Sequence, residues 1–185
     1  MSKNILLIID PQNDFITGTL AVPEAQEKMI KLSKANLTNY DYICITLDSH
    51  PDNHSSFVEN GGIWPKHCII STDGWAIPKY LDASIWLFNL LENKQVYFYK
   101  KGVNSTVEEY SIFDNPIDGV TLKNLLSKED NVDICGIAGD YCVLETLKAL
   151  RNIVDNITVL TSYTASIDKG EKLMNYIQQH NINYK

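Results

Sequence analysis

The chain contains 185 residues, of which 44% are hydrophobic and 21% charged, as in ordinary globular proteins. We expect a single domain spanning residues 1–185. A formal net charge of −7 argues against a surface that binds nucleic acid or an anionic membrane, and no apolar run approaches the roughly 20 residues that cross a bilayer. The apolar run 4–9 is too short for the core of a signal peptide, so we expect a cytoplasmic protein.

Apolar strand patterns alternate with helical patterns along the chain. We expect strands at 4–9, 42–47, 96–99, 131–138 and 157–160, and helices at 24–37, 83–91, 120–126, 143–150 and 169–179. An irregular stretch, 49–80, is rich in Gly, Pro, His and Trp, and loops of this length in a compact domain are usually functional. Strands separated by helices predict an α/β fold, a parallel sheet with helices on both faces.

The segment 132–150 carries a candidate nucleophile. Its first part is a nearly unbroken apolar run, typical of a strand buried on both faces of a parallel sheet. A Gly139–Cys142 corner follows, and then leucines at helical spacing. The thiol of Cys142 is therefore expected near a helix N-terminus, where backbone N–H groups stabilise a thiolate or an oxyanion. A lone cysteine in an apolar segment is more often an inert core residue, so the assignment depends on which other side chains reach the same place.

Ionisable residues follow the ends of four expected strands. Asp10 follows the first, Asp48 the second and Lys101 the third, while the fourth leads to Cys142. Open parallel sheets bind ligands along the edge formed by the carboxyl ends of their strands, so we expect these side chains to lie together. There Cys142 would attack a carbonyl carbon, Asp10 would accept the thiol proton, and Lys101 would favour the thiolate. Backbone N–H groups of the turn 136–142 would stabilise the oxyanion, and water would hydrolyse the thioester.

A second group of polar residues has the composition of a metal site. Asp48 and His50 are two residues apart, so they point to the same side of an extended chain, and His54 and His67 follow in the same loop. One Asp with two or three His is a mixed oxygen and nitrogen donor set that suits Zn²⁺, Fe²⁺ or Mn²⁺. A structural zinc site would use more thiolates, so we expect an open position for a substrate. The competing interpretation is that these histidines only decorate a polar loop.

Seven motifs, in order, resemble the nicotinamidase branch of the isochorismatase-like cysteine hydrolases. They are 10–15 (DPQNDF), 46–51 (TLDSHP), 54–57 (HSSF), 64–68 (WPKHC), 101–102 (KG), 110–113 (YSIF) and 136–143 (GIAGDYCV). Each motif alone is loose, but the ordered set covers residues 5 to about 165 and is specific. The resemblance implies a Rossmann-like fold, an Asp10/Lys101/Cys142 triad, and deamidation of nicotinamide to nicotinate and ammonia in NAD salvage.

The resemblance also implies a metal cofactor. One divalent ion, Zn²⁺ ahead of Fe²⁺ or Mn²⁺, would be held by Asp48, His50 and His67 and would bind the ring nitrogen of the substrate. His54 is the fourth ligand in some relatives. Others use a carboxylate in that loop, which makes Glu59 a competitor.

The remaining implied site residues surround the reacting amide. The oxyanion donors would be the backbone amides of Ala138 and Cys142, with a cis peptide bond before Ala138. The positions that line the ring pocket in the family correspond here to Phe15, Trp64, Tyr110 and Ile137.

The sequence departs from the family in three places. Gly139 stands where the family commonly has Thr, the stretch 67–72 replaces a more usual Gln-Gly-Thr continuation, and the hydrophobic segment 75–93 leaves a homo-oligomer surface open. Two alternatives to a nicotinamide hydrolase therefore stay open. One is a relative that acts on another small amide or a ureido acid. The other is a non-catalytic metal-binding module, against which the retention of Asp10, Lys101 and Cys142 counts.

Overall fold

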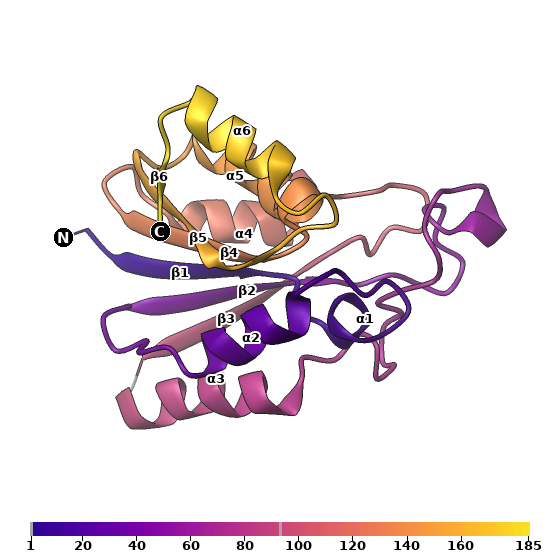
Figure 1. Cartoon of the computed structure of the whole chain (residues 1–185), viewed down its shortest axis with the longest axis horizontal. Coiled ribbons are helices and arrows are strands. Elements are labelled where there is room, and N and C mark those ends of the chain that lie inside the picture. Colours follow the sequence, from indigo (N-terminus) through magenta and orange to yellow (C-terminus); the bar gives the residue numbers. More distant parts are fainter. Residues whose placement is uncertain (1, 93) are drawn as a thin grey trace.

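A parallel β-sheet forms the centre of the molecule. The computed structural model describes residues 2–92 and 94–185, and within them the sheet has six strands (Figure 1). They are β1 (Asn4–Ile9), β2 (Tyr42–Asp48), β3 (Gln95–Lys101), β4 (Asn131–Ile137), β5 (Asn156–Ala165) and β6 (Asn183–Tyr184). Their spatial order is β3-β2-β1-β4-β5-β6, and every neighbouring pair is parallel. The chain therefore starts in the middle of the sheet and builds outward to one side and then the other.

Helices cover both faces of the sheet. They are α1 (Asn13–Ile16), α2 (Ala25–Ser33), α3 (Lys79–Glu92), α4 (Asp118–Leu125), α5 (Leu144–Leu150) and α6 (Glu171–Gln179). Figure 1 shows α2 and α3 on one side of the strands and α4, α5 and α6 on the other. The expected α/β fold with helices on both faces is confirmed. The sequence patterns missed the four-residue α1 and the two-residue β6, which are too short to show a period.

The central strands are mostly apolar because both of their faces are buried. In β1, Leu6 and Ile8 pack into the core beneath α2 and α3, while Ile5, Leu7 and Ile9 pack into the core beneath α4, α5 and α6. Each is at most 1% exposed, and full burial of such a side chain contributes roughly 1.5–3 kcal/mol. This burial fixes β1 between β2 and β4, and with it the position of the residue that follows β1.

The helix expected at 83–91 begins earlier, at Lys79. Its buried side comprises Leu81, Ile85 and Phe88, whereas Trp86 and Leu90 are exposed. The hydrophobic segment 75–93 ends at Asn93, which lies outside the described residues. No helix in the described part of the chain is long and apolar enough to cross a membrane.

Candidate active site

The carboxyl ends of the central strands deliver four ionisable side chains to one place. Asp10 follows β1, Asp48 ends β2, Lys101 ends β3, and Cys142 lies in the turn between β4 and α5. All four are buried. The structure therefore brings together the four residues that the sequence placed at this edge, next to the point where the strand order reverses between β1 and β4.

Lys101 is the centre of this group. Its Nζ lies 2.9 Å from Asp10 Oδ2, 3.1 Å from Asp48 Oδ1 and 3.5 Å from Cys142 Sγ. The other oxygen of Asp10 accepts a 2.6 Å hydrogen bond from the Thr46 hydroxyl. Asp10 has φ of +44°, an uncommon conformation for a residue other than glycine. A carboxylate that can accept a proton and a thiol thus contact the same cation, and all three groups are shielded from water.

One cation faces two carboxylates in this site, and this sets the protonation of the thiol. Burial raises the pKa of Cys142 well above its ordinary value; the charge of Lys101 opposes this shift, and the charges of Asp10 and Asp48 add to it. Burial likewise raises the pKa of Asp10, although Lys101 opposes the shift. For Lys101, burial lowers the pKa, but the two carboxylates outweigh it and raise the value well above normal. We expected Lys101 to favour the thiolate, and its charge does lower the thiol pKa, but burial and the two carboxylates act in the opposite direction, so this geometry favours a neutral thiol.

The turn that carries Cys142 is wider than an ordinary helical turn. The Val143 N–H donates to the Ala138 carbonyl five residues earlier, at 3.1 Å, and the Ile137–Ala138 peptide bond is cis, as expected. Asp140 holds the turn from outside by accepting bonds from the Ile167 and Asp168 amides, at 2.9 and 3.2 Å.

The same turn explains the departure at Gly139. A Cβ atom on Gly139 would lie 2.1 Å from Ser166 Oγ, so Ser166 takes the space that the usual Thr side chain would need.

Asp48, His50 and His67 form a cluster beside the triad. His50 Nε2 lies 3.0 Å and His67 Nε2 3.4 Å from Asp48 Oδ2. The second ring nitrogen of each histidine faces a backbone carbonyl, that of Gly102 at 3.0 Å and that of Pro65 at 2.8 Å. Such bonds place the ring proton on Nδ1 and leave the lone pair of Nε2 free to bind a metal ion. One donor atom from each residue lies within 4.8 Å of the others, an arrangement that fits a divalent metal.

Gly102 is required for this arrangement. It has φ of +69°, and a Cβ there would lie 2.5 Å from His50 Cε1 and 2.8 Å from Asp48 Oδ1. The glycine of the KG motif therefore makes room for the side chains of Asp48 and His50.

The two candidates for a fourth ligand lie in different surroundings. The His54 ring is 4.1 Å from the His50 ring, so His54 is next to the cluster. Glu59 is not brought there: its carboxylate is exposed and pairs with Lys66 at 3.2 Å. Glu59 is therefore a surface residue, and its assignment as a candidate fourth ligand is wrong.

Aromatic side chains enclose the space next to Cys142. Phe15, Trp64 and Tyr110 line this pocket, as expected from the resemblance, and the Trp64 indole N–H donates to the Tyr110 hydroxyl at 3.0 Å. Ile137 does not line it. The Ile137 side chain is wholly buried in the core beneath α2 and α3, and the next residue, Ala138, takes its place.

The pocket also contains Tyr141 and Glu108, which sequence reasoning missed. Tyr141 packs edge-on against Trp64, with 5.1 Å between ring centroids. Its position next to Cys142 in the sequence could have indicated that Tyr141 lines the pocket. No sequence feature indicated Glu108, because it lies in a polar stretch without periodicity.

Two polar residues after β1 hold the site together and were also missed. The side chain of Gln12 accepts from the Asp48 amide and donates to the Asp48 carbonyl, both at 2.8 Å. Asp14 accepts a 2.7 Å bond from the backbone amide of Cys68, next to His67. The DPQNDF motif thus supplies Asp10 and also fixes the segments that carry the metal-site residues.

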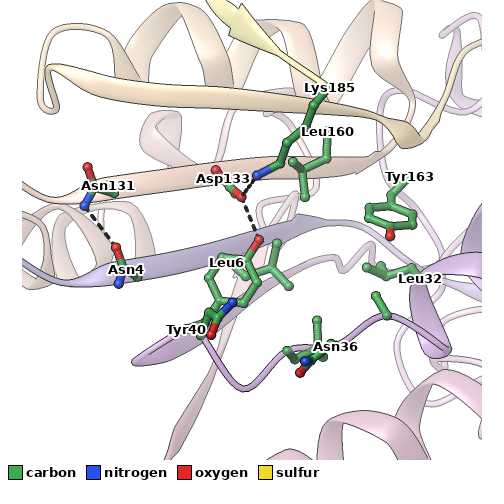
Figure 2. Close-up of a pocket in the computed structure, with 13 residues that line it drawn as sticks. Asn4, Leu6, Leu32, Asn36, Tyr40, Asn131, Asp133, Leu160, Tyr163 and Lys185 are labelled. Carbon is green, nitrogen blue, oxygen red and sulfur yellow. Dashed lines mark hydrogen bonds and ion pairs between the residues drawn. The ribbon is translucent and has the colours of Figure 1, made fainter.

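A larger hollow, of about 470 Å³, lies at the opposite edge of the sheet, where β1 and β4 begin (Figure 2). Asp133 is its central charged group and accepts bonds from the Tyr40 hydroxyl at 2.6 Å and from Lys185 Nζ at 2.9 Å. Its lining contains no cysteine or histidine. This hollow therefore lacks both the nucleophile and the mixed donor set found at the other edge.

Comparisons with known proteins agree with this geometry. No protein-family model matches the chain. The nicotinamidase/pyrazinamidase of Mycobacterium tuberculosis is 32% identical over 171 residues, which cover 88% of this chain and 86% of that protein. The nicotinamidase of Saccharomyces cerevisiae is 27% identical over 216 residues, covering 96% of this chain and 97% of that protein.

Solved structures give the same result. The Leishmania infantum (L. infantum) protein PnC1 in complex with nicotinate has a TM-score of 0.80 and 26% identity, covering all of this chain and 92% of that one. Pyrococcus horikoshii pyrazinamidase in complex with zinc has a TM-score of 0.76 and 27% identity, covering 99% of this chain and 98% of that one.

Proposed function

The chain belongs to the nicotinamidase/pyrazinamidase family of isochorismatase-like hydrolases, and we propose that Cys142, Asp10 and Lys101 are its catalytic residues. The reaction is hydrolysis of the amide bond of nicotinamide to nicotinate and ammonia, which returns the pyridine ring to NAD salvage. The observation that carries the assignment of residues is the simultaneous contact of Lys101 Nζ with Asp10 and Cys142.

The first half-reaction makes a thioester. Cys142 Sγ attacks the amide carbon while Asp10 accepts the thiol proton, so no free thiolate accumulates. Because the pKa of Asp10 is raised by its burial, its carboxylate is a better proton acceptor than an exposed one. The backbone N–H groups of Ala138 and Cys142 stabilise the oxyanion. Asp10 then gives its proton to the amide nitrogen, and ammonia leaves as the carbon–nitrogen bond breaks.

The second half-reaction regenerates the enzyme. Asp10, ionised again, accepts a proton from the water that attacks the thioester, and the carbon–sulfur bond breaks. Sγ recovers the proton from Asp10, and nicotinate is released. Lys101 remains protonated throughout, because the two buried carboxylates hold its pKa well above the normal value.

Asp48, His50 and His67 would hold one divalent metal, and zinc fits their oxygen and nitrogen donors, as Fe²⁺ or Mn²⁺ also would. When bound, the metal supplies a Lewis-acid position for the pyridine nitrogen of the substrate. Phe15 and Trp64 then contact the ring, and the carboxamide is presented to Cys142. We place the reaction in the cytoplasm, which is supported by four cysteines that are all free.

The test is ammonia release from nicotinamide by Cys142→Ala beside Cys135→Ala. Both cysteines are buried, but only Cys142 contacts Lys101, so the first variant should lose turnover and the second should keep it with some loss of stability. Substantial ammonia release by Cys142→Ala would disprove the covalent mechanism.

Substrate choice is tested with benzamide, which has the same shape as nicotinamide without the ring nitrogen. It should react much more slowly with the metal-loaded protein. Equal turnover of the two amides would remove the proposed role of the metal and favour another small amide as substrate.

A further inference from the structure

Glu108 is a carboxylate of the substrate pocket that no step above uses. It lies in the segment between β3 and α4 and lines the pocket together with Asp48, His67 and Cys142. Its Oε2 is buried and has no hydrogen-bond partner among the described residues. Glu108 as a residue is only half-buried, but a buried carboxylate oxygen without a partner is unfavourable, and a positive group next to it would remove that cost.

The neighbouring residue, Glu109, is an acid whose role is structural. Glu109 is 3% exposed, and its carboxylate accepts from the Gly102 amide at 2.7 Å and from Asn115 Nδ2 at 2.9 Å. These bonds satisfy Glu109 within the protein. Glu108, one residue earlier, turns toward the pocket instead.

Glu108 lies beside a residue of the metal cluster. Donor atoms of Glu108, His50 and His54 all lie within 4.8 Å of one another. His50 is common to this group and to the group of Asp48 and His67, so the two groups are adjacent parts of one site.

His54 is the other candidate in this second group, but both of its ring nitrogens are engaged. Its Nδ1 accepts from the Ser56 amide at 3.2 Å, which places the ring proton on Nε2. Nε2 then donates to the Val107 carbonyl at 3.1 Å. A metal bond through Nε2 would require the other tautomer and would break this contact. His54 therefore fixes the peptide that precedes Glu108.

We propose that Glu108 is the fourth protein ligand of the divalent metal and that His54 is a positioning residue that orients it. The proposal rests on the metal site of the proposed function. A metal held by Asp48, His50 and His67 compensates the buried charge of Glu108, and carboxylate oxygens are common ligands of the metals concerned.

The experiment measures Zn²⁺ affinity by competition with a chromophoric chelator. Glu108→Gln keeps the size of the side chain and removes its charge, and should weaken Zn²⁺ binding at least tenfold. Glu59→Gln is the matched control, because Glu59 is exposed and paired with Lys66, and it should bind within twofold of wild type. Glu108→Asp, which retains a carboxylate, should recover part of the affinity. His54→Gln retains a donor for the Val107 carbonyl and should lose less affinity than Glu108→Gln.

Two further measurements separate a ligand from a structural residue. The visible spectrum of the Co²⁺-loaded protein should change in Glu108→Gln and stay as in wild type in Glu59→Gln. In chelator, Glu108→Gln should unfold at the wild-type temperature or above it, because the change removes the negative charge shared by the buried, unpartnered Oε2.

Unchanged Zn²⁺ affinity and Co²⁺ spectrum in Glu108→Gln would overturn the proposal. So would a loss of affinity confined to His54→Gln, or a wild-type protein that binds no Zn²⁺. Ammonia release by the same wild-type sample reports on the proposed function separately.

Discussion

Asp10 affects Cys142 in two opposite ways. Its negative charge helps to raise the pKa of the thiol. Its oxygen is also the proposed acceptor of the thiol proton. Among the described residues, Lys101 contacts two carboxylates, Asp10 and Asp48, and Asp48 is assigned to the metal cluster, which leaves Asp10 as the acceptor. In the proposed mechanism the same carboxylate thus makes the free thiol less reactive and accepts its proton once an amide is bound.

These two effects can be separated with Asp10→Asn. Turnover should fall by roughly 10²–10⁴-fold, the usual contribution of a general base. Alkylation of Cys142 by iodoacetamide should become faster at neutral pH, because the variant loses a charge that raises the thiol pKa while Lys101 remains. The pH profile of alkylation in wild type should lie on the alkaline side of that in the variant. Asp133→Asn, at the opposite edge of the sheet, is the control and should change neither quantity. Slower alkylation of Asp10→Asn would contradict this account.

At this scale the sequence predicted which residues meet, but not their protonation states. Asp10, Asp48, Lys101 and Cys142 could be predicted because the ends of parallel strands define one edge. Whether the thiol is ionised depends on burial and on distances of about 3 Å, which no spacing reveals. Glu108 and His54 illustrate the same limit, since the direction of a loop side chain depends on its tertiary hydrogen bonds.

The pairing of β1 with β4 is the element on which the site depends most. Gly136 is opposite Ile9 in this pair and has φ of +123°. A Cβ at this position would lie 2.1 Å from the Ile9 carbonyl oxygen, and a backbone atom in a central strand cannot move aside. The glycine therefore lets β4 approach the strand that carries Asp10, just before the turn that carries Cys142.

Gly136→Ala should destabilise the fold by about 3 kcal/mol or more, because backbone strain and overpacking act together. Gly61→Ala is the matched control. Gly61 also has positive φ, of +92°, but a Cβ there would meet nothing within 4 Å, so strain alone should cost about 1–2 kcal/mol. Urea unfolding of the two variants gives the comparison. Equal losses would show that the close approach of the two strands is unimportant.

The accuracy of the sequence analysis differed among elements for physical reasons. The strand 131–138 was nearly correct, since β4 spans Asn131–Ile137 and is apolar apart from Asn131 and Asp133. The expected strand 157–160 captured less than half of β5, which continues to Ala165 through Thr161, Ser162 and Thr164. Polar residues end a hydrophobic run in the sequence, but the strand can continue through them when the backbone of the neighbouring strand supplies hydrogen-bond partners. The helix at 24–37 was overextended, because α2 ends at Ser33.

Over the whole molecule, the metal would connect the long loop after β2 to the sheet. Asp48 belongs to β2, whereas His67 lies nineteen residues later in a segment with little regular structure. That segment contains one short 3₁₀ helix, and loop hydrogen bonds hold the rest, among them His50 N–H to the Cys68 carbonyl and Ile70 N–H to the His50 carbonyl, both at 3.0 Å. Metal binding should therefore order residues 49–70 more than the rest of the chain.

Removal of the metal should lower the stability of the entire fold. A ligand that binds only the folded state stabilises it by about 2.7 kcal/mol when its free concentration is 100 times Kd. In a protein of this size that corresponds to a fall in Tm of roughly 5–11 °C when a chelator is added. Hydrogen exchange should accelerate most in 49–70, and His67→Ala should lose the zinc-dependent shift. His180→Ala should keep it, because His180 is exposed at the end of α6, away from the cluster. An unchanged Tm at saturating zinc would mean that Asp48, His50 and His67 do not bind the metal more tightly in the folded protein than the unfolded chain does.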